Sequence, residues 1–103
     1  MEDQLLESKV EEKLKRLLQR RGAMAMKFVS PGLAGVPDRL VILPGGRIVF
    51  IELKTDTGRL SPVQRVMIDR MRSVGADVRI VHGWEEARAL ADELLPEGGE
   101  HGV

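Results

Sequence analysis

Three side chains that could do chemistry together stand close in the sequence: Asp38, Glu52 and Lys54. Carboxylate oxygens on a rigid pair of strands suit Mg²⁺ or Mn²⁺, which keep several waters and also bind phosphate oxygens. A lysine beside such an ion can orient a water and offset charge in a transition state. Simple ion pairs, Glu52 with Lys54 or Asp38 with Arg39, explain the same residues without chemistry.

A β-hairpin is predicted to carry these residues, with strands at 38–43 and 47–54 and Pro44-Gly45-Gly46 between them. The turn suits three residues, with proline fixing φ and Gly46 in the left-handed position. Paired residue numbers would then add up to 90, so Asp38 would face Glu52, with Lys54 on the same face. A two-residue turn would pair by 91 and put Asp38 on the opposite face. The three-residue register also gives that face an apolar floor of Leu40, Ile42, Ile48 and Phe50.

The remaining segments alternate between amphipathic helices and short apolar strands. In chain order we predict a helix at 5–21, strands at 23–29, 38–43 and 47–54, a helix from the Ser61 cap to Gly75, a strand at 78–81 and a helix at 84–95. The second helix would bury Val63, Val66, Met67, Met71 and Val74. The order α-β-β-β-α-β-α, with hairpin strands apolar on both faces, predicts an α/β fold: a mixed central sheet of about four strands flanked by helices.

Composition narrows the class of protein. A chain of 103 residues has room for one domain, which we place at 1–96, with a flexible tail at 97–103. There is no cysteine, which excludes thiolate chemistry and fits a reducing compartment such as the cytoplasm. No apolar run approaches the ~20 residues of a membrane span. With 16 basic and 16 acidic residues, the chain lacks the excess positive charge of a protein that coats nucleic acid.

Three sequence blocks, in order and at hairpin spacing, resemble the PD-(D/E)XK nuclease superfamily. They are Gly35-Val36-Pro37-Asp38-Arg39, Ile51-Glu52-Leu53-Lys54 and Leu60-Ser61-Pro62-Val63-Gln64. Within that superfamily the chain is similar to the small stand-alone form of the virus-type replication-repair nuclease (VRR-NUC) domain, from the first helix through the strand at 78–81. The resemblance implies a restriction-endonuclease-like core and a Mg²⁺- or Mn²⁺-dependent endonuclease.

The resemblance also implies a role for individual residues. Asp38 and Glu52 match the metal-binding carboxylates, with the Leu53 backbone carbonyl as a further ligand, and Lys54 matches the catalytic lysine. Gln64 matches a glutamine near the metal centre. Because Ser61-x-x-Gln64 is also a capping box, Gln64 could instead serve only the helix start, and one side chain would not easily do both.

The family also carries a glutamate on the first helix, for which this chain offers Glu7, Glu11 and Glu12. On a helical wheel Glu7 falls inside the apolar arc, Glu11 lies just beyond its edge and Glu12 faces solvent. A carboxylate on a buried stripe is costly unless it is paired or bound to a metal, so Glu7 is the preferred candidate. The alternative is that the Glu7 side chain has no role in the site and reaches solvent from the frayed start of the helix.

The expected partner is DNA. Lys27, Arg39, Arg59 and Arg65 lie near the proposed site and could contact flanking phosphates, although each singly fits a solvated surface charge. The resemblance implies a preference for branched DNA such as a Holliday junction, cut by a homodimer. The alternatives are a catalytically inactive DNA-binding or assembly module with the same fold, and an unrelated α/β protein whose charges form salt bridges.

Overall fold

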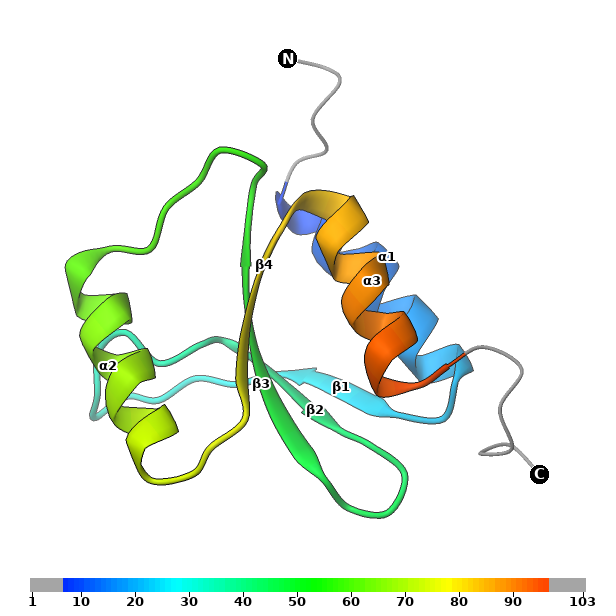
Figure 1. Ribbon diagram of the computed structural model, residues 1–103, viewed down its shortest axis with the longest axis horizontal. Coiled ribbons are helices and arrows are strands. Elements are labelled where there is room, and N and C mark those ends of the chain that lie inside the picture. Colours follow the sequence, from blue (N-terminus) through cyan, green and yellow to red (C-terminus); the bar gives the residue numbers. More distant parts are fainter. Residues whose placement is uncertain (1–6, 97–103) are drawn as a thin grey trace.

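The computed structural model describes residues 7–96. Its elements follow the predicted order, as Figure 1 shows: α1 (Glu7–Arg20), β1 (Met24–Lys27), β2 (Arg39–Ile42), β3 (Ile48–Lys54), α2 (Pro62–Ser73), β4 (Val78–His82) and α3 (Gly83–Leu94). The predicted helix start at Leu5 and the tail at 97–103 lie outside the described residues. Strands β1 and β2 are shorter than predicted, since the loop rich in proline and glycine that joins them begins earlier and ends later.

The four strands form one mixed sheet in the order β1-β2-β3-β4. Strand β2 pairs antiparallel with both β1 and β3, whereas β3 and β4 run parallel. The two hairpin strands are therefore central, as their continuous apolar character predicted. Helices α1 and α3 lie on one side of the sheet and α2 on the other (Figure 1).

The turn between β2 and β3 has three residues. The Leu43 N–H donates to the Arg47 carbonyl at 2.8 Å, and the Gly46 N–H donates to the Leu43 carbonyl at 2.9 Å. Gly45 and Gly46 both have φ near +95°, a conformation that glycine adopts at little cost. The ladder pairs Leu40 with Phe50 and Ile42 with Ile48, which confirms the register in which paired numbers add up to 90.

The main core lies between the sheet and the pair α1 and α3. Odd-numbered residues of the hairpin strands point to this side, and the buried cluster that they form with the helices is aliphatic, with Trp84 and Leu94 packed against it. The cluster contains Val10, Leu14, Leu17, Leu18, Ala23, Ala25, Val41, Leu43, Val49, Ile51, Leu53, Val81, Ala87, Leu90, Ala91 and Leu95. Even-numbered residues of the hairpin strands face α2.

Helix α2 is rotated from the predicted orientation. Ile68 is its buried residue, and Met67 and Met71 of the predicted stripe are half-buried, whereas Val63, Val66 and Val74 are 52%, 60% and 84% exposed. The cause is the side chain of Gln64, which points to the sheet and bonds to Glu52. Because residues four apart share a helix face, Gln64 brings Ile68 inward and turns Val63 and Val66 outward.

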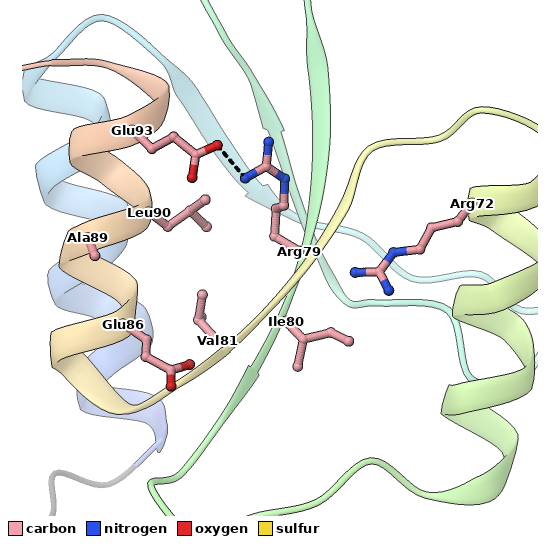
Figure 2. Close-up of a pocket in the computed structure, with 8 residues that line it drawn as sticks. All are labelled: Arg72, Arg79, Ile80, Val81, Glu86, Ala89, Leu90 and Glu93. Carbon is pink, nitrogen blue, oxygen red and sulfur yellow. Dashed lines mark hydrogen bonds and ion pairs between the residues drawn. The ribbon is translucent and has the colours of Figure 1, made fainter.

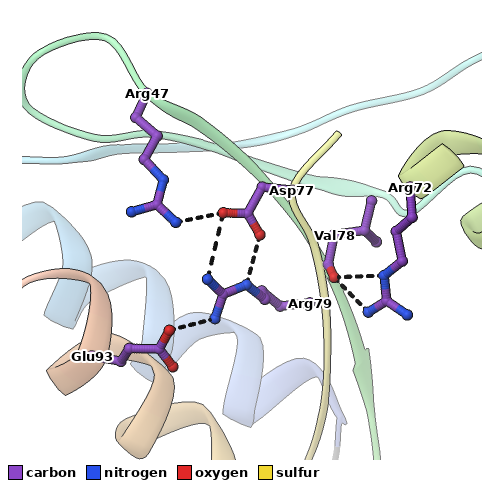
Figure 3. A network of polar contacts seen from close by, with 6 residues as sticks. All are labelled: Arg47, Arg72, Asp77, Val78, Arg79 and Glu93. Atoms are coloured by element: carbon purple, nitrogen blue, oxygen red, sulfur yellow. Dashed lines mark hydrogen bonds and ion pairs between the residues drawn. The ribbon is translucent and has the colours of Figure 1, made fainter. Parts of the chain in front are cut away.

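A polar network fixes the start of β4 (Figure 3). Asp77 accepts hydrogen bonds from Arg47 beside the hairpin turn and from Arg79, which also donates to Glu93 of α3 at 2.8 Å. Hydrogen bonding from Arg79, and to a lesser extent from Arg47, lowers the pKa of the Asp77 carboxyl. The network ties the hairpin, β4 and α3 together at the end of the sheet away from Lys54, because Val78 pairs with Phe50 and His82 pairs with Lys54.

Candidate active site

Glu52 is a buried carboxylate on the α2 face of the sheet, near the end of β3. This strand is one of the two central strands, and Glu52 is only 5% exposed. Burial raises the pKa of Glu52; the charge of Lys54 opposes this, and the negative charges of Asp38 and Glu7 raise the pKa further. Several carboxylates therefore act on one another here, an arrangement that favours a bound cation.

Lys54 and Asp38 lie on either side of this carboxylate. The Lys54 ammonium nitrogen is 3.5 Å from Glu52 Oε2, and both side chains are largely buried. Asp38 directly precedes β2, and continuing the ladder by one residue places it opposite Glu52. Its carbonyl accepts a 2.8 Å bond from the Phe28 N–H, which holds the backbone at this point, while the side chain is exposed. A fixed backbone thus presents an accessible carboxylate beside a buried one.

Gln64 caps α2 and contacts Glu52 at the same time. Its Oε1 accepts from the Ser61 N–H at 2.9 Å, its own N–H donates to Ser61 Oγ at 3.1 Å, and its Nε2 donates to Glu52 Oε2 at 3.2 Å. The expectation that one side chain could not easily do both was wrong, because the amide uses its oxygen for the cap and its nitrogen for the carboxylate. Ser61, which the sequence offered only as a cap, orients this amide.

The three glutamates of the first helix have different surroundings. Glu11 Oε1 pairs with Arg39 Nη2 at 3.0 Å in a largely buried contact on the α1 side of the sheet. Glu12 pairs with Arg16 in solvent. Glu7 is half-buried at the start of α1, and its charge acts on Glu52. Of the three, Glu7 alone combines proximity to Glu52 with no part in these two ion pairs.

Arg39 is not placed to hold a phosphate. Although it was a candidate for DNA contact, it is only 8% exposed and points to the core side of β2, where Glu11 meets it. Its Nε is buried without a hydrogen-bond partner in the described part of the chain. We therefore remove Arg39 from the candidate DNA-binding residues.

The other basic candidates are accessible. Lys27 ends β1, Arg59 lies in the loop before α2, and Arg65 is in the first turn of α2; all three are exposed. They come from three different segments of the chain. Exposed cations of this kind can contact phosphates.

The loop that delivers Asp38 is packed against the start of α2. Gly35 has φ +86°, and a Cβ there would lie 2.6 Å from the Val63 carbonyl oxygen. Pro37, immediately before Asp38, is fully buried. Gly35 therefore allows close approach of this chain's own helix α2. The motif before Asp38 thus serves packing as well as the site.

The carboxylates of the candidate site suit Mg²⁺ or Mn²⁺, which take part of their ligands from water and substrate. They are too few for a metal ion whose ligands all come from protein side chains. Within residues 7–96, no three His, Asp or Glu side chains are grouped closely enough to form such a cage. Mg²⁺ needs less, because one or two carboxylates together with waters and substrate phosphates usually complete its shell. Asp38 and Glu52 supply such a pair of oxygen donors.

A separate hollow lies away from the candidate site. About 480 Å³ in volume, it opens between β4 and α3, with Arg72 of α2 at its rim (Figure 2). Its polar lining includes Arg79 and Glu93, which bond to one another, and none of its residues belongs to the candidate site. This hollow therefore contributes no residue to the candidate site.

Comparisons with known proteins agree with the fold and with the motifs. The family model of the VRR-NUC domain matches residues 1–85. A protein of Acyrthosiphon pisum secondary endosymbiont phage 1, named "Putative nuclease p44", is 40% identical over 75 residues, which are 73% of this chain and 81% of that protein. A solved VRR_NUC domain structure superposes with a TM-score of 0.78 at 32% identity, covering 84% of this chain and 94% of that one. No helix within residues 7–96 has the length and hydrophobicity needed to cross a membrane.

Proposed function

The chain belongs to the VRR-NUC family, and from this we propose that it is a metal-dependent endonuclease that hydrolyses DNA phosphodiester bonds. The observation that carries the proposal is the environment of Glu52. A carboxylate placed only for an ion pair with Lys54 would gain nothing from further negative charge, yet Asp38 and Glu7 both act on it. A site for a divalent cation accounts for all four residues.

In the proposed reaction Asp38 and Glu52 would hold Mg²⁺ or Mn²⁺, with the Leu53 backbone carbonyl as a further ligand and the negative charge of Glu7 nearby. The bound ion would supply a Lewis acid for the scissile phosphate and lower the pKa of the attacking water. Lys54 orients that water and offsets the charge that develops on the phosphate. Gln64 supports this arrangement by fixing the Glu52 carboxylate through its 3.2 Å bond.

The proposed substrate is branched DNA, such as a Holliday junction, and the proposed setting is the cytoplasm, including that of a phage-infected cell. Lys27, Arg59 and Arg65 are exposed and would contact phosphates beside the cleaved bond. Since the formal net charge of the chain is zero, one copy would hold DNA weakly. A homodimer would bring two sites and two sets of these contacts to one junction.

Cleavage assays on branched and linear DNA test the proposal. Lys54→Ala should lower the cleavage rate by about 10²–10³-fold, the usual cost of removing a group that stabilises transition-state charge. Asp38→Asn should abolish the gain in melting temperature that Mg²⁺ gives the wild-type protein, because a ligand stabilises only the state it binds. The control is Asp69→Asn on the exposed surface of α2. Metal-dependent cutting that survives both site substitutions would refute the assignment.

The exposed valines of α2 support the dimer. Val63 and Val66 lie one turn apart on a surface that the chain itself leaves in solvent. Light scattering with and without a four-way junction should show a dimer for the wild type and a monomer for Val66→Lys. A wild-type chain that remains monomeric on the junction would rule the dimer out.

A further inference from the structure

The outer face of α1 carries a second basic surface, on the opposite side of the sheet from α2. Lys13, Arg16 and Arg20 stand at positions i, i+3 and i+7, which places them on one face of the helix, and all three are exposed. Together with Leu17 and Trp84 they line a hollow of about 220 Å³. The formal net charge of the chain is zero, so three cationic side chains around one hollow are a local excess of positive charge.

Trp84 forms the aromatic wall of the hollow. It is the only tryptophan in the chain and lies in the first turn of α3, half-buried. The Lys13 ammonium nitrogen is 4.2 Å from the centre of the Trp84 ring. Cations combined with a partly exposed aromatic ring are typical of sites for single-stranded nucleic acid, where bases stack and phosphates are neutralised.

The ion pair on this surface leaves its cation available. Arg16 Nε is 3.3 Å from Glu12 Oε2, and these side chains are 68% and 53% exposed. An exposed pair of this kind contributes little, because water and salt screen it. A phosphate can therefore compete with Glu12 for Arg16.

The hollow begins near the end of the sheet that carries the candidate active site. His82 pairs with Lys54 in the parallel register, and Trp84 follows His82 by two residues. Helix α1 starts with Glu7, whose charge acts on Glu52, and Lys13 lies six residues, or about 9 Å, further along the helix. Because the site lies on the α2 face and the hollow on the α1 face, a strand of DNA that leaves the site would pass around this end of the sheet to reach the hollow.

We propose that this hollow binds an unpaired nucleotide segment of the DNA substrate. Lys13, Arg16 and Arg20 contact its phosphates, and a base or sugar packs on Trp84 and Leu17. The inference rests on the proposed function, because it takes the ligand to be the substrate of the nearby site. An unpaired strand is favoured over a duplex, since only unstacked bases present a ring face to an aromatic wall.

The fluorescence of Trp84 gives a direct measurement, because every tryptophan signal comes from the hollow. Titration of the full chain with single-stranded oligothymidylate in EDTA should quench it to saturation. Replacing Lys13, Arg16 and Arg20 by alanine together should reduce the slope of log affinity against log salt by about 2, at roughly 0.7 per phosphate contact on a single strand. Over a fourfold rise in salt, wild-type affinity should thus fall about 16-fold more than that of the triple variant.

Two further variants and one control separate a binding role from a structural one. Trp84→Leu should weaken binding of a labelled oligonucleotide, measured by anisotropy, whereas Trp84→Phe should retain most of it because the ring face remains. Circular dichroism reports whether each variant folds. Arg70→Ala, on the exposed surface of α2, should leave quenching unchanged.

Several results would overturn the inference: no quenching at saturation, an unchanged salt slope in the triple variant, or equal quenching by a duplex or by polyglutamate. The cleavage assay distinguishes this failure from failure of the proposed function. Metal-dependent cleavage without quenching discards the hollow and keeps the nuclease. Saturable quenching without cleavage keeps a nucleic-acid site and discards the nuclease.

Discussion

The two faces of the sheet are packed in different ways. Toward α1 and α3 lies a continuous aliphatic core whose only buried ion pair joins Arg39 and Glu11 among the residues at 7–96. Toward α2 the helix buries Ile68, and beside it polar groups such as Glu52 and Gln64 bond to one another. Burial of aliphatic side chains on the first face contributes most to the stability of the fold. The second face instead holds polar groups that could take part in catalysis. Substitutions on the two faces should therefore affect different measurements.

The largest expected effect on stability is on the α1 side. Glu11→Ala would leave the Arg39 guanidinium buried without its partner, which typically costs about 3–5 kcal/mol of unfolding free energy. Glu12→Ala is the matched control, since its partner Arg16 is in solvent, and should change stability by less than about 0.5 kcal/mol. Urea denaturation measures both. Equal effects of the two substitutions would show that the Arg39 pair adds nothing to this face.

Substitutions of Gln64 test the α2 side of the sheet, where a smaller loss of unfolding free energy is expected. Gln64→Ala removes one bond to the helix cap and one to Glu52, and should lower unfolding free energy by about 1–2 kcal/mol together with the cleavage rate. Gln64→Glu can still cap the helix but sets a third carboxylate against Glu52, so the pH profile of cleavage should move to higher pH while stability falls less. If stability and activity fall in parallel in both variants, Gln64 acts only as a helix cap and has no separate role at Glu52. Gln19→Ala, exposed on α1, is the control.

The raised pKa of Glu52 predicts a pH dependence for the metal-free protein. Because the folded state holds this proton more tightly than the unfolded state, stability should decline as pH rises from about the ordinary value of 4.5 through the raised pKa. Glu52→Gln should remove this part of the decline, and Mg²⁺ should oppose it in the wild type. Urea midpoints in EDTA between pH 4 and pH 8 measure the effect. Identical profiles for wild type and variant would mean that the surroundings of Glu52 do not disfavour the ionised form of its carboxyl group.

Local turn chemistry allowed the register of the site to be predicted from sequence. Pro44-Gly45-Gly46 fixes the length of the turn, and that length alone decides that Asp38 and Glu52 share a face. Hydrophobic periodicity and local cap and turn residues predicted the other elements, including α2 after its Ser61 cap. Features determined by a few neighbouring residues could thus be predicted.

The errors concern contacts between distant segments. Helical periodicity favoured Val63 and Val66 as the buried stripe of α2, but the bond from Gln64 to Glu52 sets the rotation of the helix. Arg39 was expected at the surface because it follows Asp38, whereas strand alternation sends it to the core side to meet Glu11. Neither contact has a local signature, because each partner lies more than ten residues away in the sequence.

The shared use of Gln64 also links the opening of a helix end to the state of the site. The first turn of a helix is where local unfolding is easiest, and here fraying would withdraw the amide that holds Glu52. The N–H of Gln64 donates to Ser61 Oγ only while that turn is closed. Hydrogen exchange at this single amide would therefore report how often the carboxylate is released, and a divalent ion bound to Glu52 should slow that exchange.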